Sequence, residues 1–253
     1  MPKDSYVKFN KIDGVGYIEF YNPSHNALPS QMLTELCAVI DNAGTDNDIN
    51  ILVLKSGGDR TFCAGASFDD LAAISTIEEG ITFFMGFANV INALRKNPKI
   101  VIGSVQGKAV GGGVGLAAAV DLCFASEYAS IKLSELNIGI GPFVIEPALK
   151  RKLGLSAVSQ LTLHPQTFFS AKWAREKGLY ADVFETNDNL NKHVSSVANQ
   201  LAKYNPEALA EFKKIQWEES NHWDDLLAQR AKISGRLALS PFTKTQLKKF
   251  TKA

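Results

Sequence analysis

The sequence predicts an α/β protein that continues into a C-terminal helical appendage. Two short apolar runs, INILVLKSGG and KIVIGSVQG, each end in glycine and are followed by a helical pattern. This alternation is typical of an α/β domain. After about Asn189, long helical patterns follow one another without a strand signal. We therefore divide the chain into a core at residues 1–190 and a helical region at residues 191–253, which we expect to serve oligomerisation.

The first part of the core begins with a predicted hairpin. Residues 7–20 alternate as two short strands around Asp13 and Gly14, a pair that is typical of a tight turn. Two prolines in YNPSHNALP end this pattern, and apolar residues at helical spacing then predict a helix over residues 31–42. The two apolar runs that follow have the composition of buried strands.

The second part of the chain contains two more strand-like pieces and then helices. VDLCFAS and ASIKLSELNIGIG have strand character, and the second piece places Glu135 among apolar strand residues. In EPALKRKLG, Pro147 suits the first turn of a helix and Gly154 is expected to end it. Apolar stripes in the helical region should be buried against the core or another subunit. Their members are Val194, Val197, Leu201, Leu226, Leu227, Ile233 and Leu237.

Composition restricts the classes of partner. Lys+Arg 27 against Asp+Glu 26 leaves a formal net charge of +1, so the chain lacks the basic field typical of nucleic-acid binding. The three cysteines and four histidines are scattered, without zinc-ligand spacing or a disulfide framework. We expect Cys63 and Cys123 to pack in the core. The sequence shows no signal peptide and no membrane-spanning stretch, so we expect a cytoplasmic protein without a metal, membrane or nucleic-acid partner.

Three consecutive glycines begin the segment GGGVGLAAAVDL, residues 111–122. Where a strand meets a helix, glycine allows a tight turn or a close approach of the backbone to a ligand. The first N–H groups of a helix can also bind an anion. The run is neither a Walker loop nor G-x-G-x-x-G, so tight packing and an oxyanion site both remain open. A second junction, TFCAGASFDDL at residues 61–71, could direct another N–H group at the same oxygen.

Together these segments resemble the enoyl-CoA hydratase/isomerase, or crotonase, superfamily. The resemblance extends over nearly the whole chain. It implies a crotonase-like spiral of ββα turns, an acyl-CoA thioester as substrate, no separate cofactor, and a homotrimer or dimer of trimers. The motifs that carry it are NPSHNAL (22–28), FCAGASFDDL (62–71), VQGKAVGGGVGLAAAVDLCFAS (105–126) and SELNIGIGP (134–142).

By position in these motifs, the backbone N–H groups of Ala64 and Gly112 would hold the thioester oxygen. When a proton leaves the carbon next to a thioester, negative charge develops on this oxygen, and each fixed donor stabilises it by about 3–4 kcal/mol. The other residues that we assign to binding of the acyl-CoA are Ala27, Ala66, Phe68, Gly111 and Phe143.

The resemblance also locates the acid–base groups. The family's hydratases use two glutamates, of which this chain has the second, Glu135, whereas Gly115 stands at the position of the first. Two carboxylates suit hydration, because a water must be deprotonated while another proton reaches C2. One base is sufficient to move a double bond from position 3 to position 2. NIGIGPF also looks like the equivalent stretch of 3,2-enoyl-CoA isomerases, so we expect a single-glutamate isomerase.

Other reactions remain open from the sequence. A hydratase, such as one acting on 3-methylglutaconyl-CoA, could use Glu146 in place of the missing glutamate, although Glu146 also suits a helix start. A decarboxylase that protonates an enolate and a non-catalytic CoA-binding scaffold are further alternatives. Phe83, Phe84 and Phe87 could belong to the core or line the acyl pocket.

Overall fold

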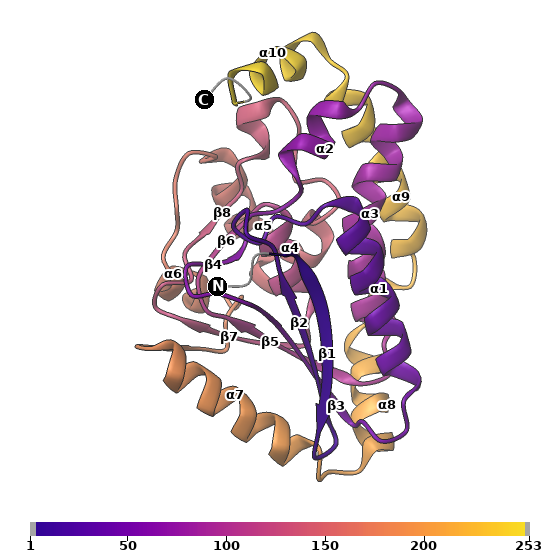
Figure 1. Ribbon diagram of the computed structural model, residues 1–253, viewed down its shortest axis with the longest axis vertical. Helices are drawn as coiled ribbons and strands as arrows, with labels where there is room; N and C mark the ends of the chain where they lie inside the picture. The colour runs from indigo at the N-terminus through magenta and orange to yellow at the C-terminus, as the bar shows by residue number, and fades with distance from the viewer. Residues whose placement is uncertain (1–3, 251–253) are drawn as a thin grey trace.

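The expected spiral of ββα turns is present in the computed structural model, which describes residues 4–250. The first turn places both β1 and β2 in a larger sheet of order β1-β2-β3-β5-β7-β9, and helix α1 follows (Figure 1). In the turns that begin with β3, β5 and β7, the first strand joins this larger sheet, the second joins a smaller sheet of order β4-β6-β8, and helical structure follows. The strands are β1 (Tyr6–Ile12), β2 (Val15–Tyr21), β3 (Ile51–Ser56), β4 (Thr61–Cys63), β5 (Ile100–Val105), β6 (Lys108–Val110), β7 (Leu122–Ser126), β8 (Ile131–Lys132) and β9 (Asp182–Phe184).

The predicted hairpin and buried strands are confirmed. β1 and β2 pair antiparallel, and the turn residues Asp13 and Gly14 have positive φ values of 50° and 79°, as a two-residue hairpin turn with the strand twist requires. The other neighbouring strands in both sheets run parallel. β3 and β5, which correspond to the two apolar runs, are buried along nearly their whole length.

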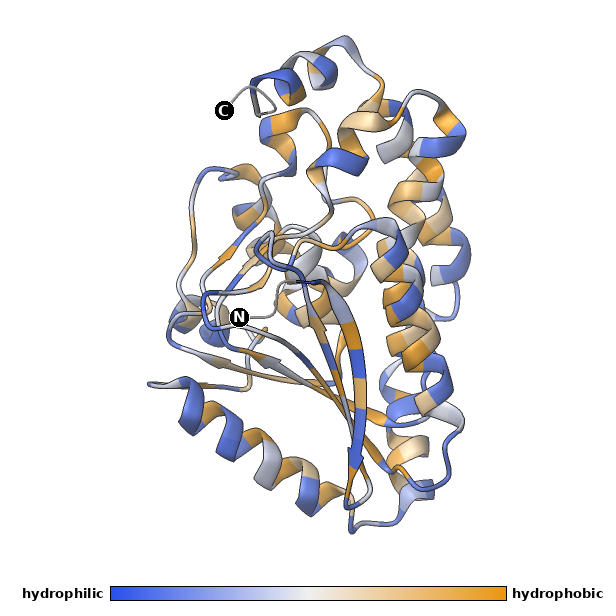
Figure 2. Cartoon of the chain, in the orientation of Figure 1, coloured by the Kyte–Doolittle hydropathy of each residue, from blue (hydrophilic) through white to orange (hydrophobic). Residues whose placement is uncertain are grey.

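Helices cover both faces of the larger sheet (Figure 1). Helices α1 and α3 pack on the face that carries Leu52 and Leu54, with α9 packed against α3, whereas α7 packs on the face that carries Ile51 and Val53. Figure 2 shows hydrophobic and hydrophilic residues alternating along α7, as expected of a helix with one buried side. The helices, with the 3-10 turns named η, are α1 (Ser30–Thr45), α2 (Phe68–Ala73), α3 (Ile77–Lys96), α4 (Gly112–Ala119), η1 (Glu135–Ile138), α5 (Glu146–Leu163), α6 (Ala171–Glu176), α7 (Asn187–Leu201), α8 (Pro206–Gln216), η2 (Glu218–Ser220), α9 (Trp223–Ala238) and α10 (Pro241–Phe250).

One local prediction is confirmed and another was wrong. Gly154 ends the first helical segment of α5, because its φ of 75° and ψ of 163° lie outside the helical region, and a second helical segment then continues to Leu163. The strand expected around Glu135 ends earlier, because Ser134 leaves the extended conformation with a ψ of 1° and the chain enters η1. The boundary drawn at residue 190 falls within α7, which packs on the larger sheet.

The side chains singled out from composition and periodicity are partly in the core. Val194 and Leu227 of the helical region are buried within this chain, whereas the other five residues of the apolar stripes are half-buried. Cys63 and Cys123 are also buried, which raises the pKa of both thiols to about 12 and confirms that they pack in the core. Within residues 4–250, no helix has the length and apolar character needed to cross a membrane. The same residues contain no cluster of three or more metal-ligating side chains.

A buried ion pair fastens α8 to the sheet. Lys213 Nζ lies 2.9 Å from Asp121 Oδ2 and donates to two backbone carbonyl oxygens at 2.8 Å. The Asp121 carboxylate also accepts hydrogen bonds from the Val101 N–H at 2.8 Å and from Trp217 Nε1 at 2.6 Å. This network compensates for the desolvation of both charges.

Lys213→Met is expected to lower the free energy of unfolding by roughly 2 kcal/mol. Breaking a buried pair commonly costs about 3–5 kcal/mol, but here Asp121 retains two N–H donors. Urea denaturation at pH 7 measures the loss. The matched control is Lys214→Met, because the Lys214 side chain is 76% exposed and lies 3.6 Å from its partner Glu211; its effect should stay below about 0.5 kcal/mol. Equal losses in the two variants would contradict the anchoring role of Lys213.

Candidate active site

Three loops meet at one edge of the smaller sheet. β4, β6 and β8 are parallel, and the segments that follow them supply residues 64–66, Gly111 and Glu135. The carboxyl ends of parallel strands lie at the same edge, which brings these distant segments together. A Cβ built on Gly65 would lie 3.5 Å from the Gly112 nitrogen, so the two glycine corners are in direct contact.

A cleft opens where these loops meet, with mainly apolar walls. Among its described lining residues, only Ser134, Glu135 and Ser234 have polar side chains. Ala27 does not line it; this residue precedes Leu28, whose N–H donates to the Gly65 carbonyl oxygen at 2.8 Å. The residues expected from the sequence that do line the cleft are Ala64, Ala66, Phe68, Gly111, Gly112, Glu135 and Phe143.

The glycines at the start of α4 combine tight packing with an available amide. Gly111 has a φ of +53°, and a Cβ there would lie 2.9 Å from Glu135 Oε1. A Cβ on Gly112 would lie 2.4 Å from the Phe87 ring. Because Gly112 is the first residue of α4, its N–H has no acceptor within the helix. Tight packing and an oxyanion site, the two possibilities that the sequence left open, are therefore compatible with each other at this corner.

In the loop after β4, the N–H group that the sequence analysis expected to hold the thioester oxygen is already paired. The Ala64 N–H already donates to the His25 carbonyl oxygen at 3.2 Å. Leu28 makes backbone hydrogen bonds with the two residues that flank Ala66 in a parallel bridge. The N–H group of Ala66 itself therefore points away from Leu28. It has no acceptor within residues 4–250. The structure therefore corrects the assignment: the available amide on this loop belongs to Ala66, not to Ala64.

Glu135 is the ionisable side chain among the described residues that line the cleft. Its Oε2 is shielded from solvent and has no hydrogen-bond partner within residues 4–250. Burial raises the pKa of this carboxyl to about 7, against the opposing effect of the Glu135 and Ser134 amides. A carboxylate with a pKa close to neutral can both accept and return a proton at physiological pH.

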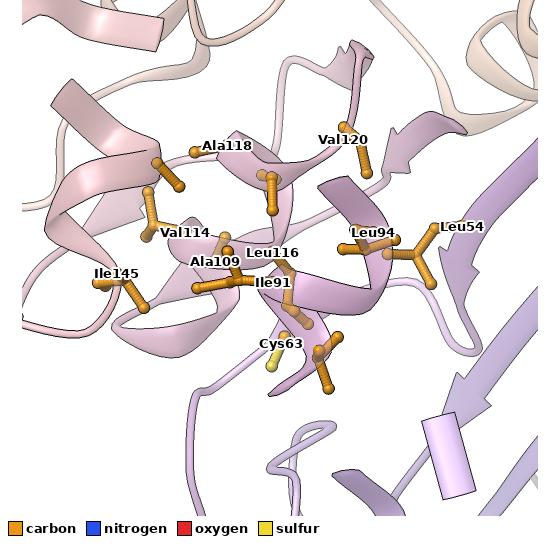
Figure 3. Close-up of a cluster of buried hydrophobic side chains, with 14 of the residues drawn as sticks. Leu54, Cys63, Ile91, Leu94, Ala109, Val114, Leu116, Ala118, Val120 and Ile145 are labelled. Atoms are coloured by element: carbon orange, nitrogen blue, oxygen red, sulfur yellow. The ribbon is translucent and has the colours of Figure 1, made fainter. Parts of the chain in front are cut away.

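Gly115 faces a side chain that fills the space beside it. A Cβ at this position would lie 2.4 Å from Ile145 Cγ2 and 2.7 Å from Ile145 Cβ. Figure 3 shows Ile145 in the same hydrophobic cluster as Val114, the neighbour of Gly115 on α4. Hydrocarbon therefore occupies the space beside Gly115, the position at which the resemblance expects the first glutamate of a hydratase, and any larger side chain there would clash with Ile145.

Glu146 lies outside the cleft, although the preceding residue lines it. It begins α5, and its Oε2 is 3.8 Å from Arg230 Nη2. The position in the first turn agrees with the helix-start alternative. The structure does not bring this carboxylate together with Glu135.

Several residues of the cleft carry no signal in the sequence. Ile145 and Ser234 line it, yet each occurs within an ordinary apolar or helical pattern. Ser234 lies on α9, far along the chain from Glu135, so only the packing of α9 against α3 brings it to the site. The sequence left open whether three phenylalanines belong to the core or line the acyl pocket. Phe83, Phe84 and Phe87 all line the cleft, and Phe83 and Phe87 are also buried in the core.

Comparison with known proteins agrees with the geometry. Residues 10–252 match the family model described as Enoyl-CoA hydratase/isomerase. The chain is 28% identical over 202 residues to a probable enoyl-CoA hydratase of Bacillus subtilis, covering 79% of this chain and 78% of that protein. It is 25% identical over 225 residues to the peroxisomal Delta(3,5)-Delta(2,4)-dienoyl-CoA isomerase of Arabidopsis thaliana, covering 83% and 79% of the two proteins.

A solved structure shows the likeness of fold. The crystal structure of an enoyl-CoA hydratase from Bacillus halodurans matches this chain with a TM-score of 0.90 at 21% identity, covering 97% of this chain and 100% of that one. With the family match over nearly its whole length, the chain belongs to the enoyl-CoA hydratase/isomerase family.

Proposed function

We propose that this protein moves the double bond of a 3-enoyl-CoA to position 2, with Glu135 as its single base. The observation that carries the proposal is the side chain of Ile145, which fills the space beside Gly115 and leaves Glu135 as the one carboxylate in the described cleft. Membership of an acyl-CoA-processing family supports a coenzyme A thioester as the substrate.

The proposed reaction conserves every atom of the substrate. The thioester oxygen accepts hydrogen bonds from the N–H groups of Ala66 and Gly112, and the Glu135 carboxylate removes a proton from C2. The two donors stabilise the resulting enolate by about 3–4 kcal/mol each. The double bond then shifts from C3–C4 to C2–C3 as Glu135 returns the proton to C4. The carboxylate is regenerated, so no water or further reactant is consumed.

The lining of the cleft favours an uncharged acyl chain. No lysine, arginine or histidine occurs among its described residues. A carboxylated chain, such as that of 3-methylglutaconyl-CoA, would lose its hydration without gaining an ion pair. The same argument disfavours a decarboxylase, whose substrate carboxylate would also be close to the Glu135 charge.

A hydratase is the second candidate, because the relative from Bacillus subtilis is named a probable enoyl-CoA hydratase. Such a reaction would need water to be activated without a second carboxylate, since the Glu146 carboxylate lies outside the cleft near Arg230. Loss of one acid–base partner typically costs about 10²–10⁴ in rate, which favours the isomerase. The expected homotrimer or dimer of trimers stays a prediction; apolar side chains exposed on α5 and α8, such as Leu163 and Ile215, are compatible with it.

The proposal is tested by incubating the protein with 3-hexenoyl-CoA. Conjugated 2-hexenoyl-CoA should accumulate, as followed by the absorbance of the conjugated thioester and confirmed by an unchanged product mass. Hexanoyl-CoA in D₂O provides a second readout, because a base beside two oxyanion donors exchanges the C2 hydrogens of a saturated thioester. Binding of hexanoyl-CoA with neither exchange nor conjugation would refute the proposal in favour of a non-catalytic scaffold.

We expect kcat/KM for 3-hexenoyl-CoA to rise with pH through about 7 and then to level off. Only the ionised Glu135 carboxylate can accept the C2 proton, and burial raises its pKa to about 7. Below this value the rate should fall about tenfold for each pH unit. A profile measured from pH 5 to pH 9 checks this, and a rate that stayed constant down to pH 5 would show that the base is not this carboxyl.

A further inference from the structure

The wall of the cleft formed by α9 carries a buried hydroxyl group without a partner. Ser234 is 1% exposed and lines the cleft. Its Oγ has no hydrogen-bond partner within residues 4–250, and so it does not bond the carbonyl four residues earlier, as helical serines often do. An unpaired buried hydroxyl is unfavourable, and native proteins contain few of them. This group therefore requires an explanation.

Close packing of the helices explains a small residue at this position but not a hydroxyl group. α3 and α9 approach closely beside Ser234, since a Cβ on Gly80 would lie 2.8 Å from the Gly235 Cα. Alanine at position 234 would allow the same approach, has a higher helix propensity and would leave no polar atom unpaired. Helix packing therefore leaves the presence of the Ser234 hydroxyl oxygen unexplained.

The position of Ser234 separates it from the groups that hold the thioester. Ser134 and Glu135 follow β8 and lie beside the Gly111 corner. Ser234 comes from α9, where the neighbouring Gly235 contacts Gly80 of α3. Phe87, which lies beside Gly112, is seven residues further along α3, a distance of about 10 Å at the helical rise of about 1.5 Å per residue. Apart from these three polar side chains, the described lining is apolar. Ser234 is therefore placed to contact the acyl chain rather than the thioester.

We propose that Ser234 determines substrate specificity and that the acyl chain of the physiological substrate carries an uncharged oxygen, a hydroxyl or a carbonyl, that hydrogen-bonds to Ser234 Oγ. A serine hydroxyl both donates and accepts, so it can pair with either group. A charged group is disfavoured because the described lining offers no cation. The inference rests on the acyl-CoA site of the proposed function, but not on the reaction that takes place there.

The test measures binding of unreactive, saturated ligands by calorimetry on the full chain. Hexanoyl-CoA is compared with 5-hydroxyhexanoyl-CoA, 6-hydroxyhexanoyl-CoA and 5-oxohexanoyl-CoA, in the wild-type protein and in Ser234→Ala. At least one oxygenated ligand should bind the wild type about tenfold more tightly than hexanoyl-CoA. Ser234→Ala should lose this preference by weakening the oxygenated ligand and strengthening the alkyl ligand, which no longer buries an unpaired hydroxyl.

Ser220→Ala is the matched control. Ser220 is also buried, but its Oγ donates to the Trp217 carbonyl oxygen at 2.6 Å, away from the cleft. This variant should keep the wild-type preference. Equal or tighter binding of hexanoyl-CoA by the wild type, or an unchanged preference in Ser234→Ala, would overturn the inference.

These outcomes are distinguishable from failure of the proposed function. A preference that depends on Ser234, together with no conjugation of 3-hexenoyl-CoA, would support the role of Ser234 and refute the isomerase. Conjugation without any preference would refute the role of Ser234 alone. Absence of binding for all four ligands would refute both proposals.

Discussion

Replacing Glu135 with glutamine is expected to lower kcat for conjugation of 3-hexenoyl-CoA by about 10³-fold. The amide has nearly the same shape but cannot accept the C2 proton, and the described cleft contains no other ionisable side chain. Because the base acts on the transition state, KM should change much less than kcat. Initial rates over a range of substrate concentrations separate the two parameters.

Two controls accompany this variant. Glu146→Gln alters a carboxylate outside the cleft, so kcat should stay within about twofold of the wild type. The stability of Glu135→Gln provides the second control. Burial raises the pKa of Glu135 from 4.5 to about 7 in the folded protein, so ionisation of the wild type reduces its stability progressively between these two pH values.

Glu135→Gln should therefore be more stable than the wild type by up to about 3 kcal/mol above pH 7, and the difference should vanish below about pH 4.5. Urea denaturation at pH 4 and pH 8 measures both values. A loss of activity that accompanies a gain in stability cannot be attributed to unfolding. More than a tenth of the wild-type kcat in this variant would show that another group takes the proton.

Introducing a second carboxylate together with space for it is expected to create hydration activity. Gly115→Glu alone should be strongly destabilised, because its Cβ would lie 2.4 Å from Ile145 Cγ2. Ile145 Cβ would also be too close, at 2.7 Å, so space requires Ile145→Gly rather than Ile145→Ala. Ile145 is the N-cap residue of α5, a position that tolerates glycine.

The double variant Gly115→Glu/Ile145→Gly should hydrate crotonyl-CoA about 10² times faster than the wild type, because two carboxylates can then share the proton transfers. The loss of absorbance of the conjugated thioester measures this rate. Ile145→Gly alone is the matched control, since it opens the same space without adding a carboxylate. An equal gain in this single variant would mean that access of water, rather than a second acid–base group, limits hydration.

The sequence predicts the elements whose signals are local. Alternation around Asp13 and Gly14 predicts the hairpin, apolar runs predict β3 and β5, and the glycine corners predict where the chain approaches the site. Each of these signals depends on neighbouring residues and on backbone sterics. Glu135 is identified as the base by the resemblance to the family. Its local sequence, a short polar segment between apolar residues, would not have singled it out.

The remaining features depend on contacts between distant segments. The choice between the Ala64 and Ala66 amides depends on how Leu28 pairs with the β4 loop, and the consequence of Gly115 depends on Ile145 from another turn of the spiral. Ser234 reaches the cleft only because α9 packs against α3. The periodicity of a single segment carries no information about these contacts between distant segments.

The ratio of two initial rates, measured on one preparation at pH 8, tests the single-base account most directly. The first rate is conjugation of 3-hexenoyl-CoA, and the second is hydration of crotonyl-CoA. The account predicts a ratio above about 10², because isomerisation needs only Glu135 whereas hydration lacks its second carboxylate. A ratio below one would contradict the account, since the protein would then activate water without a carboxylate at position 115.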